Sequence, residues 1–136
     1  MAKTNNVYIL PQDNRTKTAI LTAAKASQAN ITDAVKIADG GANGSLVKSV
    51  WALPRDTMAA ANKLSLYLYD GATTYLIDSV LMAAYTYAAT TATPTTTFAK
   101  ATDAAPIYLP SGWSLYAGAA TALAAGIAVS ALIEDY

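Results

Sequence analysis

The sequence predicts an all-β protein: a single-domain antiparallel β-sandwich or jelly-roll of about eight strands, with an extended N-terminal arm. Short segments in which apolar and polar residues alternate recur at fairly regular spacing, and glycine or proline turns separate them. No amphipathic segment long enough for a crossover helix lies between these segments, which argues against a βαβ fold. A chain of 136 residues suits one domain.

The predicted arm is residues 1–16, and the predicted sandwich domain is residues 17–136. The arm is polar except for one short apolar run, which ends at a proline. Such a run is too short to be an independent element, so we expect it to dock on the sheet edge of a neighbour or partner. Its members are the first interface candidates: Val7, Tyr8, Ile9 and Leu10.

The beginning of the domain is ambiguous, because residues 18–22 have strand composition whereas residues 23–26 have helix propensity. A short strand follows at residues 33–38, where apolar residues alternate with polar or small ones. The sequence Asp-Gly-Gly-Ala-Asn-Gly at residues 39–44 then predicts a turn. A calcium loop is the alternative for this segment, but it would need several more acidic ligands.

Residues 45–53 alternate again, which predicts a strand with two distinct faces. Strict alternation places Val47, Trp51 and Leu53 on one face and Leu46, Lys48 and Val50 on the other.

The clearest local pattern is a β-hairpin. Residues 63–69 and 74–81 alternate, and Asp70-Gly71 lies between them. Asp-Gly between two alternating runs is typical of a type I′ turn, whose two central residues both need positive φ.

The second half of the chain contains one threonine- and alanine-rich segment, residues 85–102. It predicts a long loop with one edge strand, or else a low-complexity linker. Three further strands are expected at residues 107–109, 113–117 and 127–133.

One stretch is long enough to cross a bilayer, because residues 113–133 carry no charge. It consists mostly of Ala, Gly, Ser and Thr, and its last part has the two-residue period of a strand. We therefore expect no membrane partner. Residues 1–6 lack the apolar segment of a signal peptide, so we expect synthesis in the cytoplasm.

The composition argues against an enzyme. Histidine and cysteine are absent, which removes the usual general base, the thiol nucleophile and the ordinary zinc ligands. The single glutamate is Glu134, and most aspartates adjoin turn residues, where they bond their own backbone. Asp78 is the exception, and we expect it to face solvent opposite the core. The sequence thus predicts no catalytic, cofactor-binding or metal-ligating residues.

Aromatic residues are the remaining candidates for binding. The nine tyrosines and two tryptophans are not surrounded by lysine or arginine, and the formal net charge is zero, so we expect no nucleic-acid partner. Tyrosine on a sheet packs in the core or lies at an interface. Tyr85 and Tyr87, which open the threonine-rich segment, complete the set of interface candidates.

Four segments of the chain are taken together: residues 44–50, Leu-Tyr-Leu-Tyr-Asp-Gly at 66–71, Leu-Pro-Ser-Gly-Trp-Ser-Leu-Tyr at 109–116, and the ending from residues 125–129 through Asp135-Tyr136. They are strand and turn motifs. Together they resemble small β-sandwich proteins of tailed bacteriophages, of the kind that decorate or cement the capsid exterior, and the resemblance covers residues 33–136.

This resemblance implies a virion protein on the capsid surface that binds the major capsid protein or another virion protein and stabilises the shell. It also implies a homo-oligomer, a trimer, and a charge-poor surface fits self-association. Two other classes stay open: a tail, fibre or baseplate subunit, and a small β module that binds a glycan or another small ligand.

Overall fold

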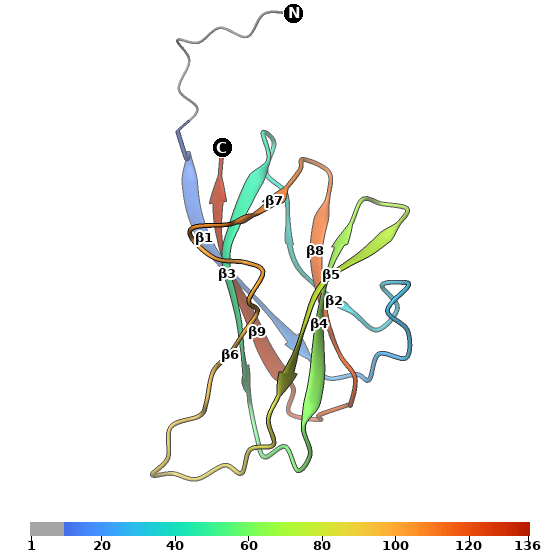
Figure 1. The fold of residues 1–136 in the computed structure, drawn as a ribbon, viewed down its shortest axis with the longest axis vertical. Helices are drawn as coiled ribbons and strands as arrows, with labels where there is room; N and C mark the ends of the chain where they lie inside the picture. Colours follow the sequence, from blue (N-terminus) through green and yellow to red (C-terminus); the bar gives the residue numbers. More distant parts are fainter. Residues whose placement is uncertain (1–9) are drawn as a thin grey trace, which may run out of the picture.

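The computed structural model describes residues 10–136. Two antiparallel sheets face each other, and no helix occurs in these residues (Figure 1). The predicted all-β class and two-sheet architecture are therefore confirmed. Nine strands form the sheets: β1 (Asp13–Leu21), β2 (Val35–Asp39), β3 (Ser45–Pro54), β4 (Asn62–Tyr69), β5 (Thr74–Met82), β6 (Thr96–Thr97), β7 (Ile107–Leu109), β8 (Ser114–Ala119) and β9 (Ile127–Asp135).

The first sheet has the order β1-β9-β3-β6, with β7 also pairing with β3, and the second has the order β2-β8-β4-β5. The chain passes repeatedly between the two sheets, and only the β4–β5 and β6–β7 steps stay within one. The first and last strands are neighbours, since β1 pairs with β9 along its whole length. No part of residues 10–136 forms a helix that could cross a membrane.

The hydrophobic core lies between the sheets, because alternate residues of each strand point inward. Its largest fully buried side chains are Phe98, Leu21, Leu64, Leu66, Met82, Leu109, Leu115, Ile127, Ile133, Val47 and Val50. Burial of each large apolar side chain contributes about 1.5–3 kcal/mol. Seven alanines are also in the core: Ala19, Ala38, Ala52, Ala101, Ala117, Ala119 and Ala131.

Strand β3 departs from strict alternation at one position. Val47 pairs with Ile133 but Ser49 pairs with Leu132, so Lys48 is an extra residue in a β-bulge. After the bulge, the residues of β3 that strict alternation would place on the outer face point into the core, and those expected in the core point outward. Val47 is buried as expected, but Val50 replaces Trp51 in the core.

The predicted faces are therefore wrong for the second half of this strand. Ala52 is also fully buried, whereas Trp51 and Leu53 lie half-buried on the outer face.

The β4–β5 hairpin is confirmed, but its turn is not type I′. The two strands pair from Asn62 with Met82 to Tyr69 with Thr74, which leaves four residues in the loop. Gly71 has a φ of 99°, whereas Asp70 has no positive φ. Instead, an Asp70 carboxylate oxygen accepts hydrogen bonds from the backbone N–H groups of Ala72 and Thr73, at 2.9 and 2.7 Å. These local bonds hold the pKa of Asp70 below its usual value, and they select the longer turn.

The sheet begins earlier than the sequence suggested. Strand β1 starts at Asp13, so residues 13–16, assigned above to the arm, pair with β9. The ambiguous stretch is a strand up to Leu21 and forms no helix after it. Residues 22–34 instead fold against the outer face of the second sheet, where Ala24 forms a bridge with Ala119.

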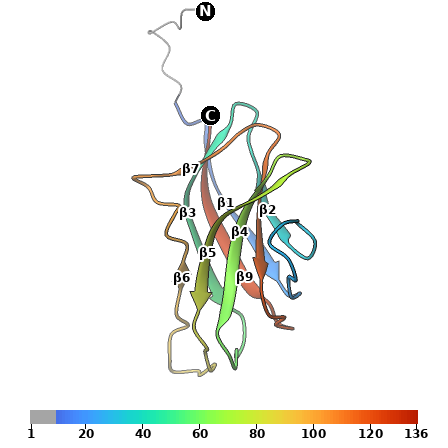
Figure 2. The same cartoon turned by 45° about the vertical axis from the view of Figure 1, so that its right-hand side comes forward.

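The threonine-rich segment is a packed loop with a short edge strand, β6. Residues 83–95 extend at one end of the sandwich (Figures 1 and 2). After β6, Phe98 is fully buried, and the backbone N–H of Lys100 donates to an Asp78 carboxylate oxygen at 3.1 Å. Asp78 is thus half-buried and holds this loop, rather than facing solvent as expected.

Candidate functional site

Val7, Tyr8 and Ile9, three of the predicted interface residues, lie outside the described residues. Leu10 is 66% exposed, just before β1, and Tyr87 is 62% exposed in the loop of residues 83–95. The start of β1 and this loop lie at opposite ends of the sandwich (Figure 1), so the described candidates do not form one surface.

Tyr85 is buried and packs within its own loop. Its backbone N–H and C=O pair with Met58, and its hydroxyl hydrogen-bonds the Thr93 hydroxyl at 3.0 Å. Of the two alternatives given above for tyrosine, packing in the core or lying at an interface, Tyr85 follows the first. It is therefore not an exposed interface residue in the isolated chain.

The outer face of the first sheet contains an uncharged surface that the strand register defines. Three rows cross β1, β9 and β3, and every side chain in them points away from the core. We call this surface the neutral face. Its first row is Thr16, Leu132 and Ser49, its second is Thr18, Ser130 and Trp51, and its third is Ile20, Ala128 and Leu53. None of the nine residues is charged.

The neutral face combines exposed apolar side chains with four hydroxyl groups, two of which are paired with each other. Ile20 is 38% exposed and Leu132 is 40% exposed. The Thr18 and Ser130 hydroxyls hydrogen-bond each other at 2.9 Å. Covering them therefore does not leave two unsatisfied polar groups, which lowers the cost of removing water from the face.

Charged groups border the neutral face. At one end, the Lys48 ammonium lies 3.4 Å from Asp103 and 3.7 Å from Glu134. At the other end, Arg55 donates to the backbone oxygen of Ala125 at 2.8 Å. An apolar centre with a polar rim is the usual anatomy of a protein–protein interface.

The free edges of the sheets are poorly suited to pairing with another strand. On β1, Lys17 stands on the core-facing side yet is exposed, and on β5 Asp78 also points inward. Inward charges on edge strands disfavour edge-to-edge association. Strand β2 has a register shift between Lys36 and Ala38, which breaks its edge. Contact through a face is therefore favoured over contact through an edge.

The carboxylates at the β2–β3 end are structural. Arg15 donates to both Asp135 carboxylate oxygens, at 2.6 and 3.0 Å, and to the backbone oxygen of Asp39 at 2.6 Å. Arg15 holds the pKa of Asp135 below its usual value, and the Ser45 hydroxyl bond at 2.5 Å adds to the effect.

The loop at residues 39–44, considered above for calcium, is a turn. Its one carboxylate, Asp39, accepts a hydrogen bond from the Ser114 hydroxyl at 2.6 Å and pairs with Lys36. Across residues 10–136, no three acidic side chains lie close enough to hold a metal ion.

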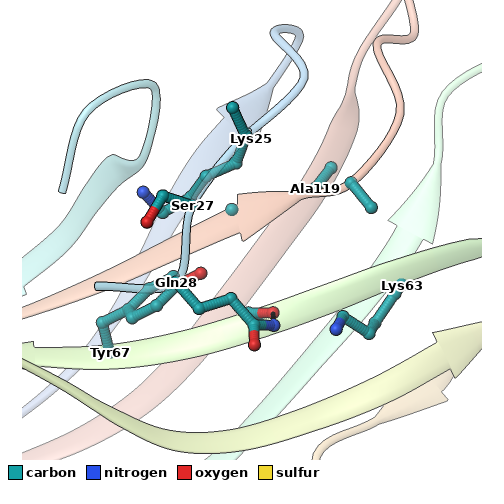
Figure 3. A pocket seen from close by; sticks show the side chains of 10 residues that line it. Lys25, Ser27, Gln28, Lys63, Tyr67 and Ala119 are labelled. Atoms are coloured by element: carbon teal, nitrogen blue, oxygen red, sulfur yellow. Dashed lines mark hydrogen bonds between the residues drawn. The ribbon is translucent and has the colours of Figure 1, made fainter. Parts of the chain in front are cut away.

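A hollow of about 440 Å³ lies on the outer face of the second sheet, between residues 25–28 and strands β4 and β8 (Figure 3). Lys25 builds one of its walls. The Lys25 side chain runs over Gly118, and its ammonium lies 5.2 Å from the centre of the Tyr67 ring.

The Lys25 ammonium fixes the β1–β2 segment. It donates to the backbone oxygens of Asn30 and Thr32 and to the Asn30 side-chain oxygen. Burial lowers the pKa of Lys25, and the nearby charge of Asp33 partly offsets this.

Replacing Lys25 with methionine should therefore keep the packing of the stem but lose these bonds. We expect the free energy of unfolding to fall by about 1–3 kcal/mol. Amide hydrogen exchange should accelerate in residues 25–34 while β3 and β9 keep their protection. Lys63→Met, at an exposed position of the same hollow, is the control; equal destabilisation by both variants would contradict this role of Lys25.

Comparisons with protein-family models, with curated proteins and with solved structures give no significant match to this chain. The sequence analysis predicted neither the neutral face nor the hollow on the second sheet. The neutral face needs the pairing of β1, β9 and β3, which are far apart in the chain, and the hollow needs the folded position of residues 22–34. The only local signal for the face is the uncharged alternation of residues 127–133.

Proposed function

We propose that this chain is a structural virion protein that binds the exterior of a bacteriophage capsid as a decoration, or cement, protein. It acts by surface and shape rather than by bond-breaking chemistry. The observation that carries the proposal is the neutral face, an uncharged outer sheet surface with exposed Ile20 and Leu132. The resemblance to decoration proteins of tailed phages supplies the partner, the major capsid protein or another virion protein.

The mechanism is mass action. A protein that binds the assembled shell and not its free subunits shifts the equilibrium toward the shell. A trimer of this chain meets a repeating lattice with several copies at once, and the linked copies gain avidity. The absence of net charge keeps repulsion between neighbouring copies small.

We also propose that the sandwich is a jelly roll. Both β6 and β7 pair with β3, and we take the longer β7 as the fourth strand of the first sheet. The orders β1-β9-β3-β7 and β2-β8-β4-β5 then support a jelly roll, because strands far apart in sequence are interleaved as two nested Greek keys require. Jelly rolls are common in viral capsid domains, which favours a virion role.

A lysine in the neutral face tests the proposal. Leu132→Lys places a charge within the contact, on its middle strand β9, where burial without a partner costs about 2 kcal/mol or more. We expect at least a roughly 30-fold loss of affinity for capsids built from the major capsid protein of the same phage. Cosedimentation or surface plasmon resonance measures this loss.

Leu81→Lys is the matched control, since Leu81 is also an exposed strand leucine but lies on the second sheet. Equal binding by Leu132→Lys and the parent protein, with both folded, would contradict the proposal. Labelled protein seen on tails or fibres by electron microscopy would favour the tail, fibre or baseplate alternative.

The solution mass gives a second test. A trimer of the purified protein supports decoration, and a clean monomer counts against it.

Any test of the arm must spare the first strand, because deletion of residues 1–16 removes four residues of β1, including Arg15. Deletion of residues 1–9 should weaken shell binding and leave the melting temperature unchanged; unchanged binding would end the arm hypothesis.

A further inference from the structure

The hollow on the second sheet has walls of different chemistry. Its floor is the methylene stem of Lys25, which runs over Gly118, together with the exposed Ala120. The ring of Tyr67 lies below this floor and is almost fully buried, and Ala119 is buried in the core. The stem and Ala120 offer a small apolar surface to the carbon–hydrogen face of a small ring.

Polar groups rise on two sides of the floor. Gln28 extends across the hollow toward Lys63 (Figure 3). Its amide nitrogen donates to the Ser65 hydroxyl at 3.0 Å, which leaves its amide oxygen as an acceptor. The Ser27 oxygen accepts the N–H of Ala29 at 3.1 Å, so its hydroxyl hydrogen is a donor. These groups match the hydroxyls of a sugar-sized molecule.

The charge of the hollow is positive. Two lysines line it, and no acidic residue does. The Lys25 ammonium is engaged by Asn30 and Thr32, and its acidic neighbour is Asp33, outside the hollow. Lys63 is exposed and, among residues 10–136, its ammonium has no ion-pair or hydrogen-bond partner. One ammonium is therefore available to an anionic ligand.

The geometry points to a binding site for a small hydroxylated carboxylic acid of monosaccharide size, a uronic acid or a molecule of similar chemistry. Lys63 pairs with the carboxylate, Gln28 and Ser27 bind hydroxyl groups, and the floor of the Lys25 stem and Ala120 packs against the ring. A hollow of about 440 Å³ lies within the usual range of small-ligand sites. This site is on the sheet opposite the neutral face, so it is independent of the proposed capsid contact.

Glucuronate and glucose are matched probes, because they share the ring and differ at the carboxylate. In a ¹H–¹⁵N NMR titration of the full chain, glucuronate should give saturable shifts, with a dissociation constant of about 1 mM. The shifts should centre on the amides of residues 27–28, 63–65 and 118–120. Glucose should bind at least about 10-fold more weakly, since it leaves the Lys63 ammonium without its partner.

Lys63→Gln removes the charge at an exposed position and should weaken glucuronate binding about 10-fold. Lys17→Gln, at an exposed lysine of the first sheet, should not change it. Equal affinity for glucose and glucuronate, equal affinity for acetate and glucuronate, or unchanged binding by Lys63→Gln would each overturn the proposal. So would the lack of any saturable shift up to about 50 mM ligand. Capsid binding by Lys63→Gln should equal that of the parent, which separates this test from that of the neutral face.

Discussion

Replacing Phe98 with alanine should lower the free energy of unfolding by about 3–5 kcal/mol. Phe98 is the only phenylalanine in the chain and is fully buried. It follows the two-residue strand β6, and its backbone N–H donates to the Val50 oxygen at 3.0 Å. The side chain therefore fills the core and also fixes the loop that joins β5 to β7. A domain of this size has about 5–15 kcal/mol of stability in total, so the variant should be partly unfolded at moderate temperature.

Urea denaturation followed by tryptophan fluorescence measures the Phe98→Ala effect. Tyr87→Ala is the control, because Tyr87 belongs to the same loop but is exposed, and it should change stability by less than about 0.5 kcal/mol. If Phe98→Ala costs less than about 1 kcal/mol, the loop does not close the core as the structure indicates.

Replacing Arg15 with alanine should have the second-largest effect, about 1.5–3 kcal/mol. The guanidinium joins three elements, because it binds the Asp135 carboxylate of β9 and the backbone of Asp39 from its own place on β1. The Arg15 and Asp135 side chains are 22% and 19% exposed, so solvent screens this pair only in part. Lys17→Ala, at an exposed lysine of the same strand, is the control.

The Arg15 variant should also change the acid sensitivity of the protein. The pKa of Asp135 lies below its usual value chiefly because of Arg15, and that of Asp39 is lowered chiefly by its bond with Ser114. Carboxylates with lowered folded-state pKa values contribute full stability above the unfolded value of about 3.9, and that stability is lost as the pH falls through the folded pKa.

The parent protein should therefore lose stability below about pH 4. Arg15→Ala should lose less over the same interval, since the pKa of Asp135 then returns toward its usual value. Urea midpoints at several pH values between 7 and 2.5 measure this. Identical acid dependence in the two proteins would show that the Arg15–Asp135 pair is not formed in solution.

The strands were predictable because their signals are local. Alternation at residues 63–69 and 74–81, with a turn between them, needs no knowledge of distant residues, and this hairpin is present in the structure. The bulge at Lys48 was not predictable in this way. It arises from how β3 pairs with β9, some 80 residues later, and one extra residue moves Val50 into the core and Trp51 to the surface.

The candidate surfaces were less predictable than the fold. Tyr85 resembles Tyr87 in sequence context, but only Tyr85 meets a backbone partner at Met58, and burial follows from that contact. The neutral face joins strands from both ends of the chain, and no sequence window contains it. Absence of histidine and cysteine, by contrast, is a property of the sequence itself and excludes thiol and imidazole chemistry directly.

Hydroxyl-radical footprinting of the capsid-bound protein tests most directly the claim that the chain works through the neutral face. Free and bound protein are oxidised in parallel, and the modification of each side chain is read by mass spectrometry. We predict strong protection of Trp51 and Leu132 on binding, and unchanged modification of Leu81 and Tyr75, which are exposed on the second sheet. Protection of Leu81 or Tyr75, with Trp51 and Leu132 still reactive, would contradict this account.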